Sequence, residues 1–455
     1  MKQFLIIASL STLLFFSCTK NNSERAVETF KENNYDTFNK PKLDSLFDIL
    51  YQNDKFMGNI SLSHKGTVIY SKSIGFDDIE TQKASTPETK YRIGSIAKMF
   101  TATLVFIAIE ENKIDLNQTI ETYFPAIENT ENITVGNLLN HRSGIRSFTK
   151  DEAFWAYRTE HKSSEEMVEI ISAYKSNFQP NSKSEYSNSN YLLLSVMLEK
   201  LYNSRYDNLI AEKITSPLKL NNTYHGGKIS IADNESNSYN YTTEWVKQIE
   251  TDLSVTMGAG SLVSSAKDLN KFIEALFNET IISKESLDMM TSIEDNFGRG
   301  IMEFSFKDHT GYGHGGNIDG FNAKSIYFPK EELAIALTSN AIDYNINSVV
   351  MDVLKCYFDE PFELPNFEQI EIKASELEKY VGYYVGDGGG SFTISQKNNT
   401  LYAQLDDFPK EPLVYKGNDV FTNEEIGANF IFNLQKNQLG LEQNGVADIY
   451  LFTKQ

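Results

Sequence analysis

"YRIGSIAKMF" covers residues 91 to 100 and places Ser95 and Lys98 three positions apart. The residues that follow, up to Ile109, are apolar on nearly every side and contain no Gly or Pro, which predicts a buried helix. Burial would remove Lys98 from water, lower its pKa and favour the neutral amine. Because residues three apart share one face of a helix, that amine could accept the Ser95 proton. The stretch therefore predicts a core helix that carries a candidate nucleophile and its base.

Ser-x-x-Lys on its own is a weak signal, because the chain contains the pattern six times. The six copies begin at Ser17, Ser95, Ser147, Ser172, Ser216 and Ser264. Ser264 is the strongest rival, since a convincing helix follows it, but Ser265 and Asp268 predict a capping box that explains these serines without chemistry. For Ser95 itself, a helix-capping serine beside a lysine that extends to solvent stays an open alternative.

A second candidate segment, "FQPNSKSEYSNSNYLLLSVMLEKL", covers residues 178 to 201 and leads from a polar loop into an apolar helix. Tyr186 lies in the loop, and a tyrosine between two cationic groups can have a lowered pKa and shuttle a proton. Asn188 offers an amide donor and acceptor to a substrate amide. Tyr-x-Asn also occurs at Tyr51 and Tyr206, so this pattern too is weak alone.

A third candidate segment, "GYGHGGNIDGF", covers residues 311 to 321 and surrounds His314 with glycines just before an expected strand. Glycines let a backbone approach a ligand closely. The competing Tyr-His-Gly-Gly sequence around His225 follows a turn-rich loop and lacks an expected strand behind it. His314 is therefore favoured over His225 as the site histidine.

Strand patterns open and close the main region of the chain, with helical patterns between them. Residues 58–76 hold two β-type runs around Lys65 and Gly66, which predicts a hairpin. Residues 322–340 hold two more runs around a proline-containing turn, and residues 346–358 follow as an amphipathic helix. This order predicts an α/β sheet whose first and last elements pack side by side.

The chain is expected to contain two folded domains. Residues 43–358 form the expected main domain, and residues 359–372, with two prolines and many acids, predict a linker. Residues 373–455 are short alternating runs separated by turn signals, which predicts a small all-β domain.

The N-terminus predicts export. Residues 1–18 hold a short apolar run that ends at Cys18, and this resembles a bacterial lipoprotein signal in which the cysteine is lipidated after cleavage. A plain secretory signal is the alternative. Residues 19–42 are polar and predict a tether. The expected location is the cell envelope, in the periplasm or at a membrane through the lipid anchor, with secretion as the alternative.

Composition excludes several classes of partner and site. The net charge of −20 argues against a nucleic-acid partner, because phosphate binding needs an excess of Lys and Arg. Cys18 and Cys356 are the two cysteines, so lipidation or removal of Cys18 leaves no internal disulfide. The histidines show no paired spacing, and CxxC and HExxH are absent from the sequence. The sequence therefore predicts no metal and no cofactor.

The three motifs at Ser95, Tyr186 and His314, in that order, resemble those of the serine β-lactamase and penicillin-binding protein family. The class C-like branch, with its β-lactamases, D-alanyl-D-alanine peptidases, D-aminopeptidases and esterases, is the most similar. "LLNHRSGI" at residues 138–145 supports the likeness, and "LEKYVGYYV" at 377–385 is similar to the β-barrel-like domain often appended to such hydrolases. The resemblance implies a β-lactamase/transpeptidase-like α/β (α+β) fold, with an antiparallel sheet flanked by helices, a helical subdomain and a small C-terminal all-β domain.

The resemblance also implies a role for each motif residue in a two-step acyl-enzyme reaction. Ser95 would be the acylated nucleophile, Lys98 its general base, and Tyr186 would share the proton transfers. Asn188 would hold the substrate amide.

The third motif would line the other side of the site. His314 and Gly316 would contact the substrate from an edge strand, and the backbone N–H groups of Ser95 and Asn317 would form the oxyanion hole.

The third motif departs from the family's Lys-Thr/Ser-Gly pattern. His314 replaces a permanent cation and is expected to be charged only in part near neutral pH, and Gly315 removes a hydroxyl. This weakens carboxylate-bearing substrates and leaves small esters, amides or short peptides, peptidoglycan-derived ones among them. One alternative is a catalytically weak ectodomain that acts as a binding or sensory module. The other is a helix-rich lipoprotein without an active site.

Overall fold

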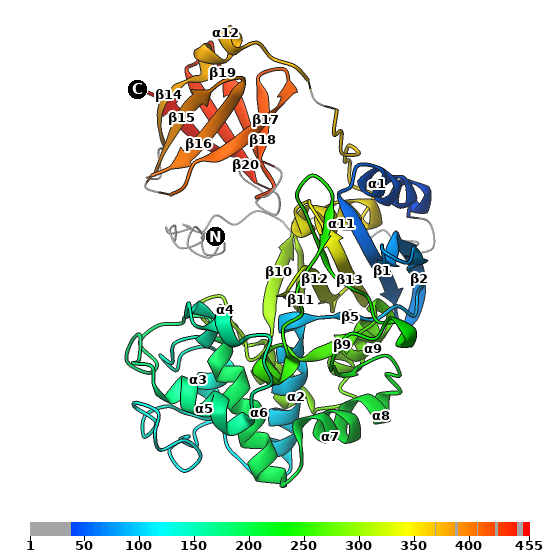
Figure 1. Ribbon diagram of the computed structural model, residues 1–455, viewed down its shortest axis with the longest axis vertical. Coiled ribbons are helices and arrows are strands. Elements are labelled where there is room, and N and C mark those ends of the chain that lie inside the picture. The colour runs from blue at the N-terminus through cyan, green and yellow to red at the C-terminus, as the bar shows by residue number, and fades with distance from the viewer. Residues whose placement is uncertain (1–37, 369, 387–389, 407, 424–425, 444–448) are drawn as a thin grey trace, which may run out of the picture. The chain divides into compact units, whose positions relative to one another are not determined.

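The computed structural model describes residues 38–368, 370–386, 390–406, 408–423, 426–443 and 449–455 (Figure 1). The expected signal peptide, the lipidation site at Cys18 and most of the expected tether lie outside the described residues. Helix α1, Lys40–Gln52, begins inside the segment expected as tether, because Asn39 caps it and Pro41 stands in its first turn. Among the described residues, we find no helix with the length and apolar character needed to cross a membrane.

An eight-stranded sheet, in which the spatial order of the strands differs from their order along the chain, forms the centre of the first domain. In spatial order its strands are β10 (Met302–Phe306), β11 (His309–Ile318), β12 (Phe321–Phe328), β13 (Leu333–Ile342), β1 (Phe56–His64) and β2 (Thr67–Ile74). All of these neighbours are antiparallel. The short strands β7 (Tyr239–Tyr241) and β8 (Trp245–Lys247) extend the sheet beside β13. The β1–β13 pair, with Ile60 opposite Leu337, confirms that the first and last elements lie side by side.

Helices cover both faces of this sheet. On one face the Tyr70 hydroxyl of β2 donates to Asp44 of α1 at 2.9 Å. On the other face the Ser63 hydroxyl of β1 donates to Glu274 at 2.7 Å. Glu274 lies in α9, Ala266–Phe277. Tyr70 pairs with Leu62, the neighbour of Ser63, and successive strand residues point to opposite faces, so α1 and α9 lie on opposite sides. Helix α11, Ile346–Tyr357, packs beside α1.

A helical subdomain surrounds α2, Ala97–Glu110, as Figure 1 shows. Every residue of α2 up to Phe106 is buried, which confirms the core helix predicted from its apolar surface. Phe100 stacks on Phe272 of α9 with ring centroids 3.7 Å apart, so α2 joins the subdomain to the sheet side. The other helices here are α3 (Val135–Leu139), α4 (Phe154–Tyr157), α5 (Ser164–Ser172), α6 (Asn188–Tyr202), α7 (Tyr206–Ile210), α8 (Ser216–Leu218) and α10 (Lys284–Thr291).

Small strands lead the chain into α2. Strands β5 (Tyr91–Arg92), β9 (Leu262–Ser264) and β6 (Tyr224–His225) form a separate sheet, and β3 (Phe76–Asp78) pairs with β4 (Lys83–Ala84). After β5 the chain enters a single 3-10 turn, η1, which covers Gly94–Ile96 and runs directly into α2. Ser95 therefore lies at the junction of a strand and a buried helix.

The C-terminal part is a closed barrel, in agreement with the predicted all-β domain. Helix α12, Ala374–Leu377, precedes it. Its strands are β14 (Gly382–Gly386), β15 (Ser391–Lys397), β16 (Thr400–Leu405), β17 (Glu411–Gly417), β18 (Val420–Asn423), β19 (Ala428–Asn433), β20 (Gln438–Gln443) and β21 (Tyr450–Lys454). Tyr384 pairs with Lys454 to close the barrel. Tyr380, Phe421 and Phe432 contact one another inside it, with ring centroids 4.8 to 5.6 Å apart.

Candidate active site

Close backbone contact between η1 and β11 fixes the position of Ser95. A Cβ atom on Gly316 would lie 1.9 Å from the Ile93 carbonyl oxygen and 3.0 Å from the Ser95 backbone nitrogen. A Cβ atom on Gly94, whose φ is +50°, would lie 2.8 Å from the backbone nitrogen of Asn317. Glycine is required at both positions, because a side chain would push the two backbones apart. The backbone nitrogens of Ser95 and Asn317 therefore lie at one shared contact.

A buried ion-pair network holds this contact in place. The Arg92 guanidinium lies 3.2 Å from Asp319 and 3.0 Å from Glu250. Asp319 also accepts hydrogen bonds from Arg158 and from the Thr251 hydroxyl, both at 2.7 Å. Arg92 ends β5, just before η1, and Asp319 follows β11 directly. The network therefore ties together the two segments whose backbones meet, and its charges are paired as burial requires.

Lys98 is fully buried and makes three short polar contacts. Its Nζ lies 2.9 Å from Ser95 Oγ, 2.8 Å from Asn188 Oδ1 and 2.7 Å from the Ala259 carbonyl oxygen. Burial lowers the pKa of Lys98 well below its ordinary value of 10.5, because desolvation penalises the charged form. The amine at this position is therefore neutral over a wider pH range than a lysine in water.

The partners of Lys98 decide where its lone pair points. A neutral amine has two N–H bonds and one lone pair. The oxygens of Asn188 and Ala259 can only accept, so they take the two N–H bonds. Ser95 Oγ carries a proton and is the one contact of the three that can donate. The arrangement therefore leaves the lone pair of Lys98 for the Ser95 hydroxyl.

Asn188 is itself held by two side chains from a segment about 40 residues earlier in the chain, between α3 and α4. Ser147 Oγ accepts from the Asn188 backbone nitrogen at 3.1 Å, and Thr149 Oγ1 accepts from its amide nitrogen at 2.9 Å. Because the amide nitrogen is engaged, the amide oxygen faces Lys98. Ser147, one of the six Ser-x-x-Lys serines, thus caps the start of α6 near Asn188.

Tyr186 lies beside both Ser95 and Lys98. The Lys98 Nζ is 4.9 Å from the centre of its ring. Burial raises the pKa of Tyr186 above the ordinary value of 10.0, and a hydrogen bond with Ser95 lowers it by less. The expectation of a lowered tyrosine pKa was therefore wrong. It assumed two cations beside the ring, whereas Lys98 is desolvated and held toward its neutral form.

His314 lies inside β11 and not before a strand, and its ring is 6.3 Å from that of Tyr186. Burial lowers the pKa of His314 to about 3, so the imidazole is neutral at pH 7. The expectation of partial charge near neutrality was wrong, because the sequence did not reveal how deeply the ring is buried. Its Nδ1 lies within hydrogen-bond distance of the Gly315 carbonyl oxygen.

Strand β11, expected to be an edge strand, lacks a second neighbouring strand over only half of its length. Strand β11 lies between β10 and β12, but its pairing with β10 ends where Gly313 faces Met302. From His314 to Ile318, β11 pairs with β12 alone. The half of β11 that contacts η1 therefore has an open side, on which an extended ligand could form main-chain hydrogen bonds.

His141 is a site residue that sequence reasoning missed. Its ring lies 4.4 Å from that of Tyr186, and its Nδ1 accepts a hydrogen bond from the Ser187 backbone nitrogen at 3.2 Å. Burial keeps the pKa of His141 well below its ordinary value of 6.5. The neutral ring therefore positions the loop that carries Tyr186. The signal was its place in "LLNHRSGI", which we used only as a sign of resemblance.

The rival residues have structural partners elsewhere. Ser264 Oγ lies 2.8 Å from Thr223 Oγ1, and Ser265 Oγ accepts from the Asp268 backbone nitrogen at 3.2 Å. Ser265 is thus a helix cap, but the carboxylate of Asp268 accepts from Asn222 at 2.7 Å instead of closing the predicted capping box. His225 lies in β6, paired with β9, so it does have a strand around it.

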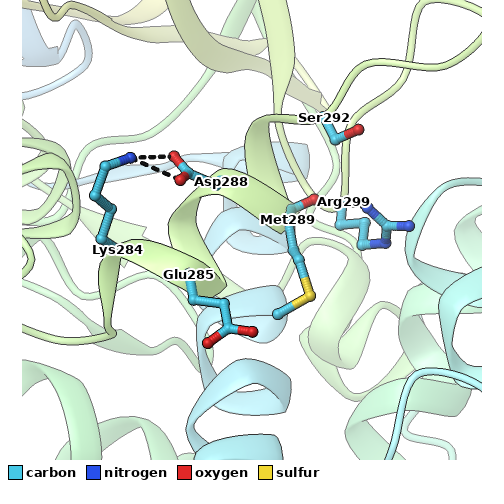
Figure 2. A pocket seen from close by; sticks show the side chains of 6 residues that line it. All are labelled: Lys284, Glu285, Asp288, Met289, Ser292 and Arg299. Carbon is cyan, nitrogen blue, oxygen red and sulfur yellow. Dashed lines mark hydrogen bonds and ion pairs between the residues drawn. The ribbon is translucent and has the colours of Figure 1, made fainter.

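We use the name Ser95 cluster for Ser95, Lys98, Tyr186, Asn188 and His314. A hollow of about 630 Å³ lies along α10, and Figure 2 shows the side chains that line it. They are Lys284, Glu285, Asp288, Met289, Ser292 and Arg299. None belongs to the Ser95 cluster, and Lys284 is paired with Asp288 at 2.6 Å. The hollow therefore brings no further group to Ser95.

Comparison with known proteins agrees with this geometry. The family model Beta-lactamase matches residues 56–345, which include the whole Ser95 cluster. Penicillin-binding protein 4* of Bacillus subtilis (strain 168) is 23% identical over 400 residues, which are 81% of this chain and 88% of that protein. The teichoic acid D-alanine hydrolase of Staphylococcus aureus (strain MRSA252) is 26% identical over 223 residues, which are 49% of this chain and only 54% of that protein.

A solved structure supports the same assignment. The octameric penicillin-binding protein homologue from Pyrococcus abyssi superposes with a TM-score of 0.66 at 25% identity, over 91% of this chain and 99% of that chain. The β-lactamase/transpeptidase-like fold is thereby confirmed. With a family match over more than half of its length, the chain belongs to the beta-lactamase family, in the superfamily of serine β-lactamases and penicillin-binding proteins, and is a serine hydrolase.

Proposed function

We propose that this hydrolase cleaves a small ester or amide of a D-amino acid through an acyl-enzyme on Ser95. One observation carries the proposal: the fully buried Lys98 Nζ lies 2.9 Å from Ser95 Oγ, and its two other partners, the oxygens of Asn188 and Ala259, can only accept hydrogen bonds. A capping serine with a solvent-facing lysine, the alternative for this motif, does not fit a lysine that is fully buried.

Acylation would begin with proton transfer from Ser95 Oγ to Lys98 Nζ. The oxygen attacks the substrate carbonyl carbon, and the carbonyl π electrons move to its oxygen. The backbone N–H groups of Ser95 and Asn317, which lie at one close contact, would stabilise that oxyanion. Collapse of the intermediate breaks the bond to the leaving group, which receives the proton held by Lys98, passed on through the Tyr186 hydroxyl.

Deacylation would reverse these roles. A water molecule gives a proton to Lys98 while its oxygen attacks the acyl carbon. The bond from that carbon to Ser95 Oγ then breaks, and the proton returns from Lys98 to Ser95 Oγ. Because the pKa of Tyr186 is raised, its phenol stays protonated and is suited to pass a proton and not to act as a permanent anion.

The choice of substrate rests on the open side of β11 and on the named relatives. The residues after Gly313 lack a β10 partner, so an extended acyl group could pair with them. The Staphylococcus aureus relative is named a teichoic acid D-alanine hydrolase, which favours a D-alanyl ester. The predicted export signal would place the enzyme near such substrates in the cell envelope. Export and lipidation of Cys18 are part of this proposal.

The rate of substrate cleavage by a protein that comprises residues 19–455 tests the proposal. We would compare D-alanyl esters, their L-alanyl counterparts, D-alaninamide and nitrocefin, using wild type and Ser95→Ala. We expect the D-alanyl ester to be cleaved fastest and Ser95→Ala to lose about 10³-fold or more in kcat. Equal rates for the D-alanyl and L-alanyl esters would refute the proposed preference for a D-amino acid. Turnover that survives in Ser95→Ala would refute the nucleophile.

A further inference from the structure

A tight turn with the sequence Glu-Asp-Asn-Phe lies beside the ring of Tyr186. Glu294 and Phe297 exchange two backbone hydrogen bonds, at 2.9 and 3.0 Å. The two residues between them, Asp295 and Asn296, have φ angles of +47° and +73°. Positive φ at both central residues is typical of a type I′ turn, and Asp and Asn adopt it more readily than most side chains. The turn is therefore closed on itself, and a contact that holds Asp295 also holds Phe297.

Phe297 joins two rings of the candidate active site. Its side chain is half-buried, and its ring centroid lies 5.1 Å from that of His141 and 6.1 Å from that of Tyr186. Both distances are in the range of favourable aromatic pairs. The rings of His141 and Tyr186 are themselves 4.4 Å apart. The three rings therefore form one cluster, in which Tyr186 contacts both neighbours.

Arg142 ties this turn to the loop that carries Tyr186. Its Nε donates to Asn181 Oδ1 at 2.9 Å, and its Nη2 donates to the Asn181 carbonyl oxygen at 2.8 Å. These two bonds fix the plane of the guanidinium, because its donors form a rigid fork. The remaining terminal nitrogen, Nη1, pairs with Asp295 and lies 3.1 Å from Glu294. One side chain therefore holds the segment before Tyr186 and the turn beside it.

The residues that follow the turn are fixed independently. The Arg299 backbone nitrogen donates to the Met290 carbonyl oxygen, at the end of α10, at 2.8 Å. A Cβ atom on Gly300, whose φ is +80°, would lie 2.9 Å from the Lys98 carbonyl oxygen, so this backbone lies directly against α2. The base of the segment is thus attached to the helix that carries the candidate base, and Arg142 holds its tip.

We propose that Arg142 positions Tyr186 for proton transfer by holding the Glu294–Phe297 turn against it. This inference rests on the proposed function, in which the Tyr186 hydroxyl passes a proton from Lys98 to the leaving group. Proton transfer needs both partners within hydrogen-bond distance, and a displacement of about 1 Å can cost about 10²-fold in rate. The ring cluster restricts the movement of the tyrosine. Arg142 acts through that cluster and is a positioning residue.

Esters that differ in their leaving group separate this role from a merely structural one. Ethanol is a much weaker acid than 4-nitrophenol, so ethoxide needs a proton as it leaves, whereas 4-nitrophenolate leaves without one. The measured quantity is the ratio of kcat/KM for the 4-nitrophenyl ester of D-alanine to that for its ethyl ester. The rate of fluorophosphonate labelling at Ser95 is the reference, because fluoride also leaves without a proton.

The first variants remove the contacts of the turn with Arg142. The side chains of Glu294 and Asp295 are 57% and 56% exposed, so the double variant Glu294→Gln/Asp295→Asn does not disturb the core. We expect it to lower kcat/KM for the ethyl ester by about 10-fold, the effect of losing a hydrogen bond to a charged group. The 4-nitrophenyl ester should lose less, and the labelling rate should not change.

Two substitutions of Arg142 and one control complete this series. Arg142→Met should raise the ratio at least as far as the double variant does, and Arg142→Lys should restore part of the wild-type value. Asp288→Asn is the matched control, because it removes an exposed carboxylate of α10 that is paired with Lys284 at 2.6 Å. Its ratio should equal that of wild type.

Phe297→Ala tests the ring that transmits the effect. It should lower kcat/KM for the ethyl ester more than for the 4-nitrophenyl ester. Combined with Glu294→Gln/Asp295→Asn, its effect should not add, because both changes act through one turn. Additive losses in the combined variant would overturn the inference.

Failure of the inference can be told from failure of the proposed function. If folded wild type neither reacts with a fluorophosphonate at Ser95 nor cleaves either ester, both fail. If Tyr186→Phe raises the ratio but Glu294→Gln/Asp295→Asn keeps the wild-type value, only the inference fails. It also fails if Arg142→Met lowers both esters and the labelling rate alike while its circular dichroism and Tm show a folded protein.

Discussion

Lys98 Nζ donates to the side-chain oxygen of Asn188 at 2.8 Å, and this contact orients the amine toward Ser95. Asn188 is neutral, so it accepts an N–H bond without stabilising the ammonium as a carboxylate would. Lys98 can therefore act as a neutral base only while no negative charge lies beside its amine.

Asn188→Asp tests that dependence. The new carboxylate would lie against Lys98 and raise its pKa, because an opposite charge favours the ammonium. We expect kcat near pH 7 to fall by about 100-fold or more, the range of general-base effects, with the rising limb of the pH–rate profile shifted to higher pH. Asn112→Asp, on the exposed turn after α2, is the control. An unshifted profile in Asn188→Asp would contradict the role of Lys98.

Lys98→Met should give a more stable but inactive protein. The folded-state pKa of Lys98 is below its ordinary value of 10.5, so between these values the unfolded chain binds a proton that the folded chain does not. Wild-type stability therefore rises with pH through that window, and the cost of burying the lysine disappears as pH approaches 10.5.

Urea unfolding followed by circular dichroism at pH 7, 8, 9 and 10 measures this difference. The stability advantage of Lys98→Met over wild type should be greatest at pH 7 and shrink as pH rises. An advantage of about 1 kcal/mol would raise Tm by about 2–4 °C. A constant gap from pH 7 to pH 10, or a less stable variant, would count against a lysine buried as a neutral amine.

Tyr186→Phe removes the phenol hydroxyl beside Ser95 and keeps the ring that packs on His141. We expect kcat to fall by about 10²- to 10⁴-fold with a smaller change in KM, as for a proton-transfer group. Because burial raises the pKa of Tyr186, the wild-type profile should show no falling limb due to this residue below pH 10. Tyr51→Phe, at an exposed Tyr-x-Asn sequence, is the matched control and should match wild type.

Gly316→Ala should separate η1 from β11. The new Cβ would meet the Ile93 carbonyl oxygen at 1.9 Å, so the backbone must move. Overpacking of this kind costs about 1–3 kcal/mol, and moving Asn317 away from Ser95 should lower kcat as well. Gly227→Ala is the control, since nothing lies within 4 Å of the Cβ position there. If a folded Gly316→Ala protein kept the wild-type kcat, the backbone N–H groups at this contact would have no role in the mechanism.

Sequence reasoning located the parts of this fold that depend on local pattern. The apolar surface of the segment after Ser95 predicted a buried helix, and α2 is buried throughout its first ten residues. The runs around Lys65 and around Pro329 predicted two hairpins, which the structure shows as β1–β2 and β12–β13. Periodicity and turn residues carry this information because neighbouring residues decide it.

Features that depend on distant segments were not predictable in the same way. The protonation of His314 depends on burial by elements far along the chain, so its charge was predicted wrongly. The open half of β11 likewise depends on where its pairing with β10 stops. The roles of Ser95, Lys98 and Tyr186 stay predictions.

Intact-protein mass spectrometry after treatment with a fluorophosphonate shows whether Ser95 is an activated nucleophile. Wild type, Ser95→Ala and Ser264→Ala would be treated in parallel, with folding checked by circular dichroism. We expect one adduct on wild type and on Ser264→Ala, and none on Ser95→Ala. An adduct that persists in Ser95→Ala, or no adduct on folded wild type, would contradict Ser95 as an activated nucleophile, and the latter would favour a binding module.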